Sequence, residues 1–249
     1  SGLAGLGIDL TQRQLSARNL LDVERVRLGA QEPAPEAFTE LKNEHDIVLA
    51  TMGRMSMEKN QAALIEALAL LRKQDGTEGS GAQGLNVGLA IVGSGVLEAT
   101  LRARLDSLGL CGHVVLLGQM DNPFPVLGGA DLFVLPSLHE GQPVTLLEAM
   151  TLGTAVVASD LPGNRELIAL GYGVLSGTSP QDIAQAIRTA LADPLRARGT
   201  FDVQEHNARS LRDTLDAVLG SEALHQQSKE DEASPRSRCS RGASQGAIA

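Results

Sequence analysis

Aromatic residues are scarce in this chain, and their scarcity limits the ligands that it can bind. The 249 residues include no tryptophan, one tyrosine and four phenylalanines. Proteins that bind single-stranded nucleic acid stack its bases on aromatic side chains, so this class of partner is disfavoured. The formal net charge of -9 also disfavours nucleic acid and anionic membrane surfaces. With so few aromatic residues, the hydrophobic core must be aliphatic.

Cysteines and long apolar runs are scarce as well. Cys111 and Cys239 stand far apart in the sequence, and we expect both to be free thiols in a reducing compartment. No apolar run approaches the length that spans a bilayer, and no signal peptide is visible. These features predict a cytoplasmic location, with the inner face of the membrane as an alternative.

The chain does contain a regular alternation of apolar runs and helical patterns. Strands are predicted at 46–53, 87–93, 113–118, 130–135, 154–159 and 173–175. Helices are predicted at 57–74 (with Ser56 as its cap), 96–108, 164–169, 180–192 and 203–219, with one more over the segment that contains Glu148. This alternation predicts an α/β fold with a doubly wound parallel sheet, Rossmann-like and covered on both faces. Ligands of such sheets bind beyond the carboxyl ends of the strands.

The predicted sheet belongs to one domain at 46–220. Residues 1–45 have weak periodicity, with a helix expected near 11–27 and then a connection rich in proline and glutamate. The glycine-rich segment 76–84 is expected to be a surface loop. The tail at 221–249 is rich in Ser, Gln, Arg and Ala, and we predict that it is disordered.

Two glutamates eight positions apart, Glu140 and Glu148, form the most informative pair in the sequence. Pro143 lies between them and suits the first turn of a helix. Glu140 is therefore expected in the loop before that helix, beside N–H groups that attract anions, and Glu148 inside it. A carboxylate among apolar residues needs a partner or contact with water, and a polyol ligand would supply the partner. Two ordinary solvent-exposed glutamates are the alternative.

Two cations, Arg54 and Lys59, follow the first predicted strand. Lys59 is expected in the first turn of the next helix, where a cation is unfavourable unless it serves an anion. Arginine offers a bidentate fork and lysine a point charge, so the pair predicts a clamp for a diphosphate. The alternative is two solvated surface cations.

The G-S-G segment at 93–95 follows a predicted strand, as a dinucleotide fingerprint would. The sixth residue is Glu98 instead of glycine, and no acidic residue ends the next strand, so a nicotinamide-dependent dehydrogenase is disfavoured. A tight turn that admits a phosphate or the sheet edge is the better interpretation. His139 has no second ligand at metal-binding spacing, so no metal site is predicted. Asp160 and Asn164 are expected to shape a turn and to cap a helix.

Taken together, these residues resemble the C-terminal, donor-binding half of a retaining glycosyltransferase of the GT-B fold, in glycosyltransferase family 4 (glycosyl transferases group 1). The resemblance covers about 7–192. It is carried by the segment 130–137, the E-x7-E motif of Glu140 and Glu148, the Arg54/Lys59 pair and the glycine turn. It implies that the N-terminal half is missing, with 1–45 as its end or as a linker.

The resemblance also implies a role for each matching residue. Glu140 would contact the donor sugar and Glu148 the ribose, while Arg54 and Lys59 would neutralise the leaving diphosphate. Because these cations would replace a metal, no metal or other cofactor is expected. Further donor contacts are implied for Gly53, Gly95, Met120, Gly141, Gln142, Val144 and Thr145, with backbone N–H groups acting in the last three and Met120 near the base.

The reaction implied is transfer of a sugar from a nucleotide sugar to a glycan, lipid-linked or small-molecule acceptor. The anomeric configuration would be retained, by front-side attack assisted by the leaving phosphate. The expected setting is polysaccharide or glycolipid biosynthesis. Two alternatives stay open: a non-catalytic nucleotide-sugar-binding module, and a nucleotide-sugar epimerase of the same two-domain architecture.

Overall fold

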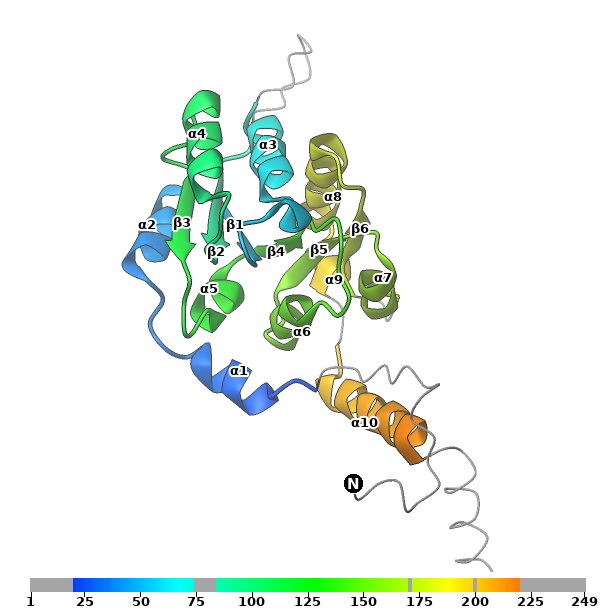
Figure 1. Cartoon of the computed structure of the whole chain (residues 1–249). Coiled ribbons are helices and arrows are strands. Elements are labelled where there is room, and N and C mark those ends of the chain that lie inside the picture. Colours follow the sequence, from blue (N-terminus) through cyan, green and yellow to red (C-terminus); the bar gives the residue numbers. More distant parts are fainter. Residues whose placement is uncertain (1–19, 74–83, 170–171, 199–200, 220–249) are drawn as a thin grey trace, which may run out of the picture. The chain divides into compact units, whose positions relative to one another are not determined.

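A parallel six-stranded sheet forms the centre of the fold. In a computed structural model, residues 20–73, 84–169, 172–198 and 201–219 are described. The strands are β1 (Ile47–Met52), β2 (Val87–Val92), β3 (Val114–Gly118), β4 (Leu132–Leu135), β5 (Ala155–Ser159) and β6 (Val174–Ser176). Their order is β3-β2-β1-β4-β5-β6, and all neighbours pair in parallel (Figure 1). The predicted doubly wound, Rossmann-like sheet is confirmed, and its order reverses between β1 and β4.

Helices pack on both faces of the sheet and form two hydrophobic cores. One core contains α3 (Gln61–Arg72), α4 (Glu98–Leu108), α8 (Pro180–Ala192) and α9 (Pro194–Arg198). The other contains α1 (Val23–Gly29), α2 (Glu36–Glu44), α5 (Phe124–Gly129), α6 (Val144–Thr151) and α7 (Pro162–Ile168). The buried residues of the first core are aliphatic, as predicted, whereas the second core also buries Phe38, Phe124, Phe133 and Tyr172. Along β1, Leu49 enters the first core, while Val48 and Ala50 enter the second. This alternation explains why the strand is apolar except at Thr51.

Three short helices, α2, α5 and α9, were not predicted. The expectation of a connection after residue 27 is wrong at 36–44, where α2 buries Phe38 and Leu41 and packs against β1, β2 and β3. Only these two buried residues mark its inner face, and the charged residues around them conceal the helical period. Residues 19–207 form one compact unit, and α10 (Val203–Leu219) continues beyond it.

Several helix starts differ from the prediction. The helix expected from residue 57 begins at Gln61, because Asn60 adopts a left-handed conformation with φ of 54°. Before it, Met57–Lys59 form a 3-10 turn, η2, and Ser56 makes no side-chain cap. Lys59 therefore lies in η2 and not in the first turn of α3. Asparagine tolerates this conformation better than most residues, which allows the chain to turn sharply here.

Other boundaries are corrected or lie outside the described residues. Pro143 is the residue before α6, and Asn164 lies inside α7 instead of capping it. The helix expected at 11–27 is present as α1 only from Val23, and 1–19 fall outside the described residues. The segments 74–83 and 220–249 fall outside them too, so the predicted surface loop is covered only at Gly84 and the predicted disordered tail not at all.

A chain of hydrogen bonds joins α2, α3 and the amino end of the sheet. The Arg72 guanidinium donates to His113 Nε2 (3.0 Å), and His113 Nδ1 lies 2.8 Å from His45 Nε2. His45 Nδ1 lies 2.9 Å from the Leu41 carbonyl oxygen. Because arginine can only donate, each imidazole accepts at Nε2 and donates from Nδ1. Both rings are therefore neutral in this arrangement.

This arrangement predicts a loss of stability in acid. Burial, then Arg72 and His45, lower the pKa of His113, while Glu44 opposes them. The unfolded chain thus binds a proton more readily, so the contribution of His113 to stability falls as the pH drops through about 6.5. Glu148, whose pKa is raised, has the opposite effect in this range, so the contribution of His113 is measured as the difference in urea unfolding between wild type and His113→Gln. After allowance for solvent screening, wild type should lose up to about 1 kcal/mol relative to His113→Gln between pH 7.5 and 5.5, whereas substitution of the exposed His139 should keep the pH dependence of wild type. Parallel curves for wild type and His113→Gln would contradict the prediction.

Candidate functional site

The candidate site lies at the carboxyl edge of the sheet, where β1 and β4 are neighbours and the strand order reverses. The loop after β1 and the loop after β4 are joined by a hydrogen bond from the Leu138 N–H to the Glu58 carbonyl oxygen (2.7 Å). Asn60 Nδ2 donates to the carbonyl oxygens of Pro136 (3.1 Å) and Thr178 (3.0 Å). Asn60 thus joins three loops. The prediction missed this residue, although an asparagine directly before a helix is a recognisable signal.

The glycine turn at 93–95 packs directly against the loop after β1. A Cβ on Gly93, whose φ is +126°, would lie 2.2 Å from the Gly53 carbonyl oxygen. One on Gly95 would lie 2.4 Å from the Met55 carbonyl oxygen, and the Met55 N–H donates to the Ser94 carbonyl (3.0 Å). Of the two interpretations of this turn, the structure supports close approach of the sheet edge.

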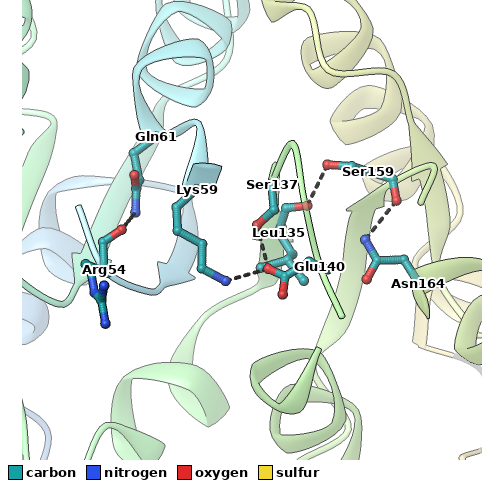
Figure 2. Close-up of polar contacts among 8 residues, drawn as sticks. All are labelled: Arg54, Lys59, Gln61, Leu135, Ser137, Glu140, Ser159 and Asn164. Atoms are coloured by element: carbon teal, nitrogen blue, oxygen red, sulfur yellow. Dashed lines mark hydrogen bonds and ion pairs between the residues drawn. The ribbon is translucent and has the colours of Figure 1, made fainter. Parts of the chain in front are cut away.

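Glu140 is held by two side chains. Lys59 Nζ lies 2.5 Å and Ser137 Oγ 2.7 Å from the same carboxylate oxygen, Oε1 (Figure 2). The Glu140 side chain is 8% exposed and that of Lys59 25%. A carboxylate this buried requires such partners to remain ionised. No described residue bonds Oε2, so this oxygen remains as an acceptor. Glu140 lies in the loop before α6 as predicted.

Arg54 and Lys59 differ in their surroundings, which the prediction of a joint clamp did not anticipate. Lys59 is paired with Glu140, whereas Arg54 is exposed and no described residue bonds its guanidinium. The backbone of Arg54 is nevertheless fixed, because its carbonyl accepts from Nε2 of the buried Gln61 (3.0 Å; Figure 2). Arg54 is therefore the cation available to an incoming anion, and Lys59 reaches one only by leaving or sharing Glu140.

The start of α6 offers fewer N–H groups than predicted. The Val144 N–H donates to the Gln142 carbonyl (2.9 Å), so it is already engaged. The Thr145 N–H has no acceptor among the described residues and remains available. The preceding loop is in close contact with α7, since a Cβ on Gly163 would lie 2.9 Å from the Gly141 carbonyl oxygen.

Glu148 lies half-buried in α6, and no described residue bonds its carboxylate. Burial raises its pKa to about 7, although Arg25 opposes the shift. The carboxyl group is therefore divided between its neutral and charged forms near neutral pH. A ligand that donated hydroxyl hydrogen bonds to it would favour the charged form.

Two buried side chains form hydrogen bonds with the backbone at the carboxyl ends of β4 and β5. Ser159 Oγ donates to the Leu135 carbonyl (3.1 Å), and Asn164 Nδ2 donates to the Ser159 carbonyl (2.8 Å; Figure 2). Asn164, which was predicted to cap a helix, is thus buried beside the end of β5 and bonds to its backbone.

Met120 follows β3, which is an edge strand of the sheet, and is partly buried against the second core.

The residues that the structure describes include neither a candidate metal cluster nor a candidate membrane helix. Among them, no cluster of three or more His, Cys, Asp or Glu side chains is arranged to hold a metal ion. None of their helices combines the length and the apolar character needed to cross a membrane.

Comparison with known sequences assigns the chain to a family. The profile of the family described as glycosyl transferases group 1 matches residues 34–227, and the chain belongs to this family. The match includes α2, which lies within the segment expected to be a linker or the end of a missing N-terminal domain.

Two curated relatives illustrate the sequence similarity. The N-acetylgalactosamine-N,N'-diacetylbacillosaminyl-diphospho-undecaprenol 4-alpha-N-acetylgalactosaminyltransferase of Campylobacter jejuni is 29% identical over 184 residues, which are 70% of this chain and 47% of the relative. The GDP-mannose-dependent alpha-(1-6)-phosphatidylinositol dimannoside mannosyltransferase of Mycobacterium tuberculosis is 30% identical over 152 residues, 61% of this chain and 37% of the relative. This chain thus spans less than half the length of either protein.

Solved structures share the fold. HepE from Anabaena, crystallised with UDP and glucose, matches with a TM-score of 0.58 and 22% identity over 87% of this chain and 56% of that one. The C-terminal domain of the group 1 glycosyltransferase LpcC from Francisella tularensis matches with a TM-score of 0.54 and 18% identity, over 82% of this chain and 99% of that one.

Proposed function

We propose that this chain is the donor-binding half of a glycosyltransferase, which transfers a sugar from a nucleotide sugar to an acceptor with retention of anomeric configuration, as in family 4. The observation that carries the proposal is the meeting of Lys59 and Glu140 at the switch point of the sheet, with Arg54 exposed beside them. A cation pair and an acceptor oxygen there suit a diphosphate linked to a sugar.

Each proposed role follows from what the side chain can offer. Glu140 would accept a sugar hydroxyl at Oε2, and Glu148 would accept from the two ribose hydroxyls, which its unpaired carboxylate favours. Arg54, joined by Lys59, would neutralise the charge that develops on the departing diphosphate. Such a pair requires no metal cofactor. The Thr145 N–H would meet a phosphate oxygen, while Val144 would first have to release the Gln142 carbonyl.

The remaining donor contacts are proposed for the loops around these residues. Gly53 and Gly95 would let the diphosphate approach the backbone, Gly141 and Gln142 would face the sugar, and Met120 would lie towards the base. The acceptor would bind mainly to a further domain. Because the two relatives named above carry diphospho-undecaprenol and phosphatidylinositol dimannoside in their names, we propose a lipid-linked or glycan acceptor at the cytoplasmic side of a membrane.

Donor binding is tested by thermal unfolding with UDP-, GDP-, ADP- and CDP-linked sugars at millimolar concentration. A ligand at about 100 times its Kd stabilises the folded state by about 2.7 kcal/mol, so at least one of these should raise Tm by several degrees. Arg54→Ala should lose most of this rise. Arg102→Ala, which removes an exposed arginine of α4 paired with Glu98, should keep it. Absence of a shift with all of the sugars would refute the proposal.

The reaction products distinguish the proposed transferase from its two alternatives, the non-catalytic module and the epimerase. With the donor that binds and an added N-terminal half, transfer to an acceptor supports the transferase. Binding without turnover would favour the module. Release of free nucleotide diphosphate without an acceptor would favour the epimerase, once slow donor hydrolysis is subtracted.

A further inference from the structure

We propose that Ser137 is a positioning residue, which holds Glu140 in place for the donor sugar while Lys59 turns to the leaving diphosphate. The inference rests on the proposed function. Its starting point is that Ser137 and Lys59 bond the same oxygen, Oε1, and leave Oε2 to the ligand. Because two side chains bond this oxygen, Lys59 can leave while Ser137 still holds the carboxylate in place.

The two side chains that hold Glu140 differ in their freedom to move. The Lys59 side chain is 25% exposed and has four rotatable carbons, so its ammonium group can swing towards an anion. Ser137 is fully buried and has a single side-chain torsion. A diphosphate that enters beside Arg54 would attract the ammonium group of Lys59, whereas the hydroxyl of Ser137 cannot follow.

The backbone around Ser137 is fixed on both sides. The carbonyl of Pro136 accepts from Asn60 Nδ2 (3.1 Å), and the N–H of Leu138 donates to the Glu58 carbonyl (2.7 Å). These bonds connect the segment to the loop after β1, so the serine hydroxyl is held at one position relative to Lys59.

A hydroxyl in a fixed position is needed because two negatively charged groups, the carboxylate of Glu140 and the diphosphate, would lie close together here. When Lys59 shares its charge with the diphosphate, the carboxylate of Glu140 and the phosphates repel each other. The bond from Ser137 keeps the carboxylate oriented and compensates in part for the lost cation. Oε2 then stays directed at a sugar hydroxyl during the step in which the diphosphate departs.

Ser159 supplies a matched control. Like Ser137, it is a buried serine at the carboxyl end of a strand, and its hydroxyl donates one hydrogen bond. The acceptor, however, is the carbonyl of Leu135 and not Glu140. Ser159→Ala and Ser137→Ala therefore remove the same chemical group from similar environments, and only the second releases Glu140.

The test compares a nucleotide sugar with its own nucleotide diphosphate by isothermal titration calorimetry. The probe is the UDP-, GDP-, ADP- or CDP-linked sugar that raises the wild-type Tm most, and its partner is the nucleotide diphosphate of the same base. The ratio that matters is the Kd of the nucleotide sugar divided by the Kd of its nucleotide diphosphate. In Ser137→Ala this ratio should rise at least about tenfold, because Glu140 contacts only the sugar. The affinity for the nucleotide diphosphate should stay within about twofold. Ser159→Ala should keep the wild-type ratio.

The outcomes distinguish the inference from the proposed function. An unchanged ratio in Ser137→Ala, or an equal change in Ser159→Ala, overturns the positioning role alone. Failure of wild type to bind any of these probes overturns both. If Ser137→Ala does not fold, Ser137→Cys replaces it, since a thiol has nearly the same shape but donates weakly. Its ratio should shift in the same direction by a smaller factor, and an unshifted ratio overturns the inference.

Discussion

Replacing Glu148 with glutamine is expected to stabilise the free protein above pH 7 and to abolish its response to a nucleotide sugar. The carboxyl pKa is about 7 in the folded state and about 4.5 in the unfolded chain. The contribution of Glu148 to stability is therefore complete below about pH 4.5 and is lost as the pH rises through 7. With allowance for partial solvent access, the cost at pH 8 is about 1–2 kcal/mol. Glutamine keeps the shape and removes the charge that must be buried.

Urea unfolding at pH 5 and pH 8 measures this effect. The variant should be about as stable as wild type at pH 5 and more stable by about 1–2 kcal/mol at pH 8. Glu98→Gln in α4, where the side chain is 37% exposed, is the control and should show no comparable gain at pH 8. The same samples are then titrated with the nucleotide sugar. Equal stability at pH 8, or an undiminished rise in Tm with the sugar, would show that Glu148 does not act as described.

Replacing Gly93 with alanine is expected to destabilise the protein by about 3 kcal/mol or more, a fall in Tm of roughly 6–12 °C. Its φ of +126° is rarely adopted by residues with a Cβ, and the new methyl group would lie 2.2 Å from the Gly53 carbonyl oxygen. Because that oxygen belongs to the backbone of β1's exit loop, relief requires the loop to move away. The loop that carries Arg54 would then shift as well.

Gly112→Ala is the control for this substitution. A Cβ at Gly112 meets no atom within 4 Å, and its backbone lies outside the left-handed region. Its Tm should stay close to that of wild type. Thermal unfolding of the two variants side by side decides the matter, and a Gly93→Ala variant as stable as Gly112→Ala would disprove the predicted clash.

The sheet was predictable because its strands are buried on both faces. In a run such as that of β1, Thr51 is the one polar residue among six, so the apolar run alone locates the strand. The helix α2 was not predictable, since Phe38 and Leu41 are its only buried residues. The break before α3 depends on the left-handed Asn60, which propensity alone does not distinguish from the first turn of a helix.

The residues of the site were easier to predict than their partners. Glu140, Lys59 and Arg54 follow strands whose carboxyl ends must share an edge, so their proximity follows from the fold. The ion pair between Lys59 and Glu140 spans 81 positions, and no local pattern reports it. Ser137 belongs to the segment 130–137 that carries the family resemblance, but no role was predicted for it, because it lacks the sequence context of a hydrolase nucleophile. Its role depends on the short distance to Glu140, which only the structure supplies.

The joined loops at the carboxyl edge have a consequence for the thermodynamics of binding. Hydrogen bonds from Asn60, Met55 and Leu138 order these loops when the chain folds, before any ligand arrives. The conformational entropy of the loops is then lost during folding, and little remains to be lost on association. Substitutions that loosen the loops should reduce the affinity for a ligand, because the loops must then be ordered again on binding. This holds even where the substituted residue contacts no ligand atom. Part of the affinity proposed for the nucleotide sugar would in this way be determined when the chain folds.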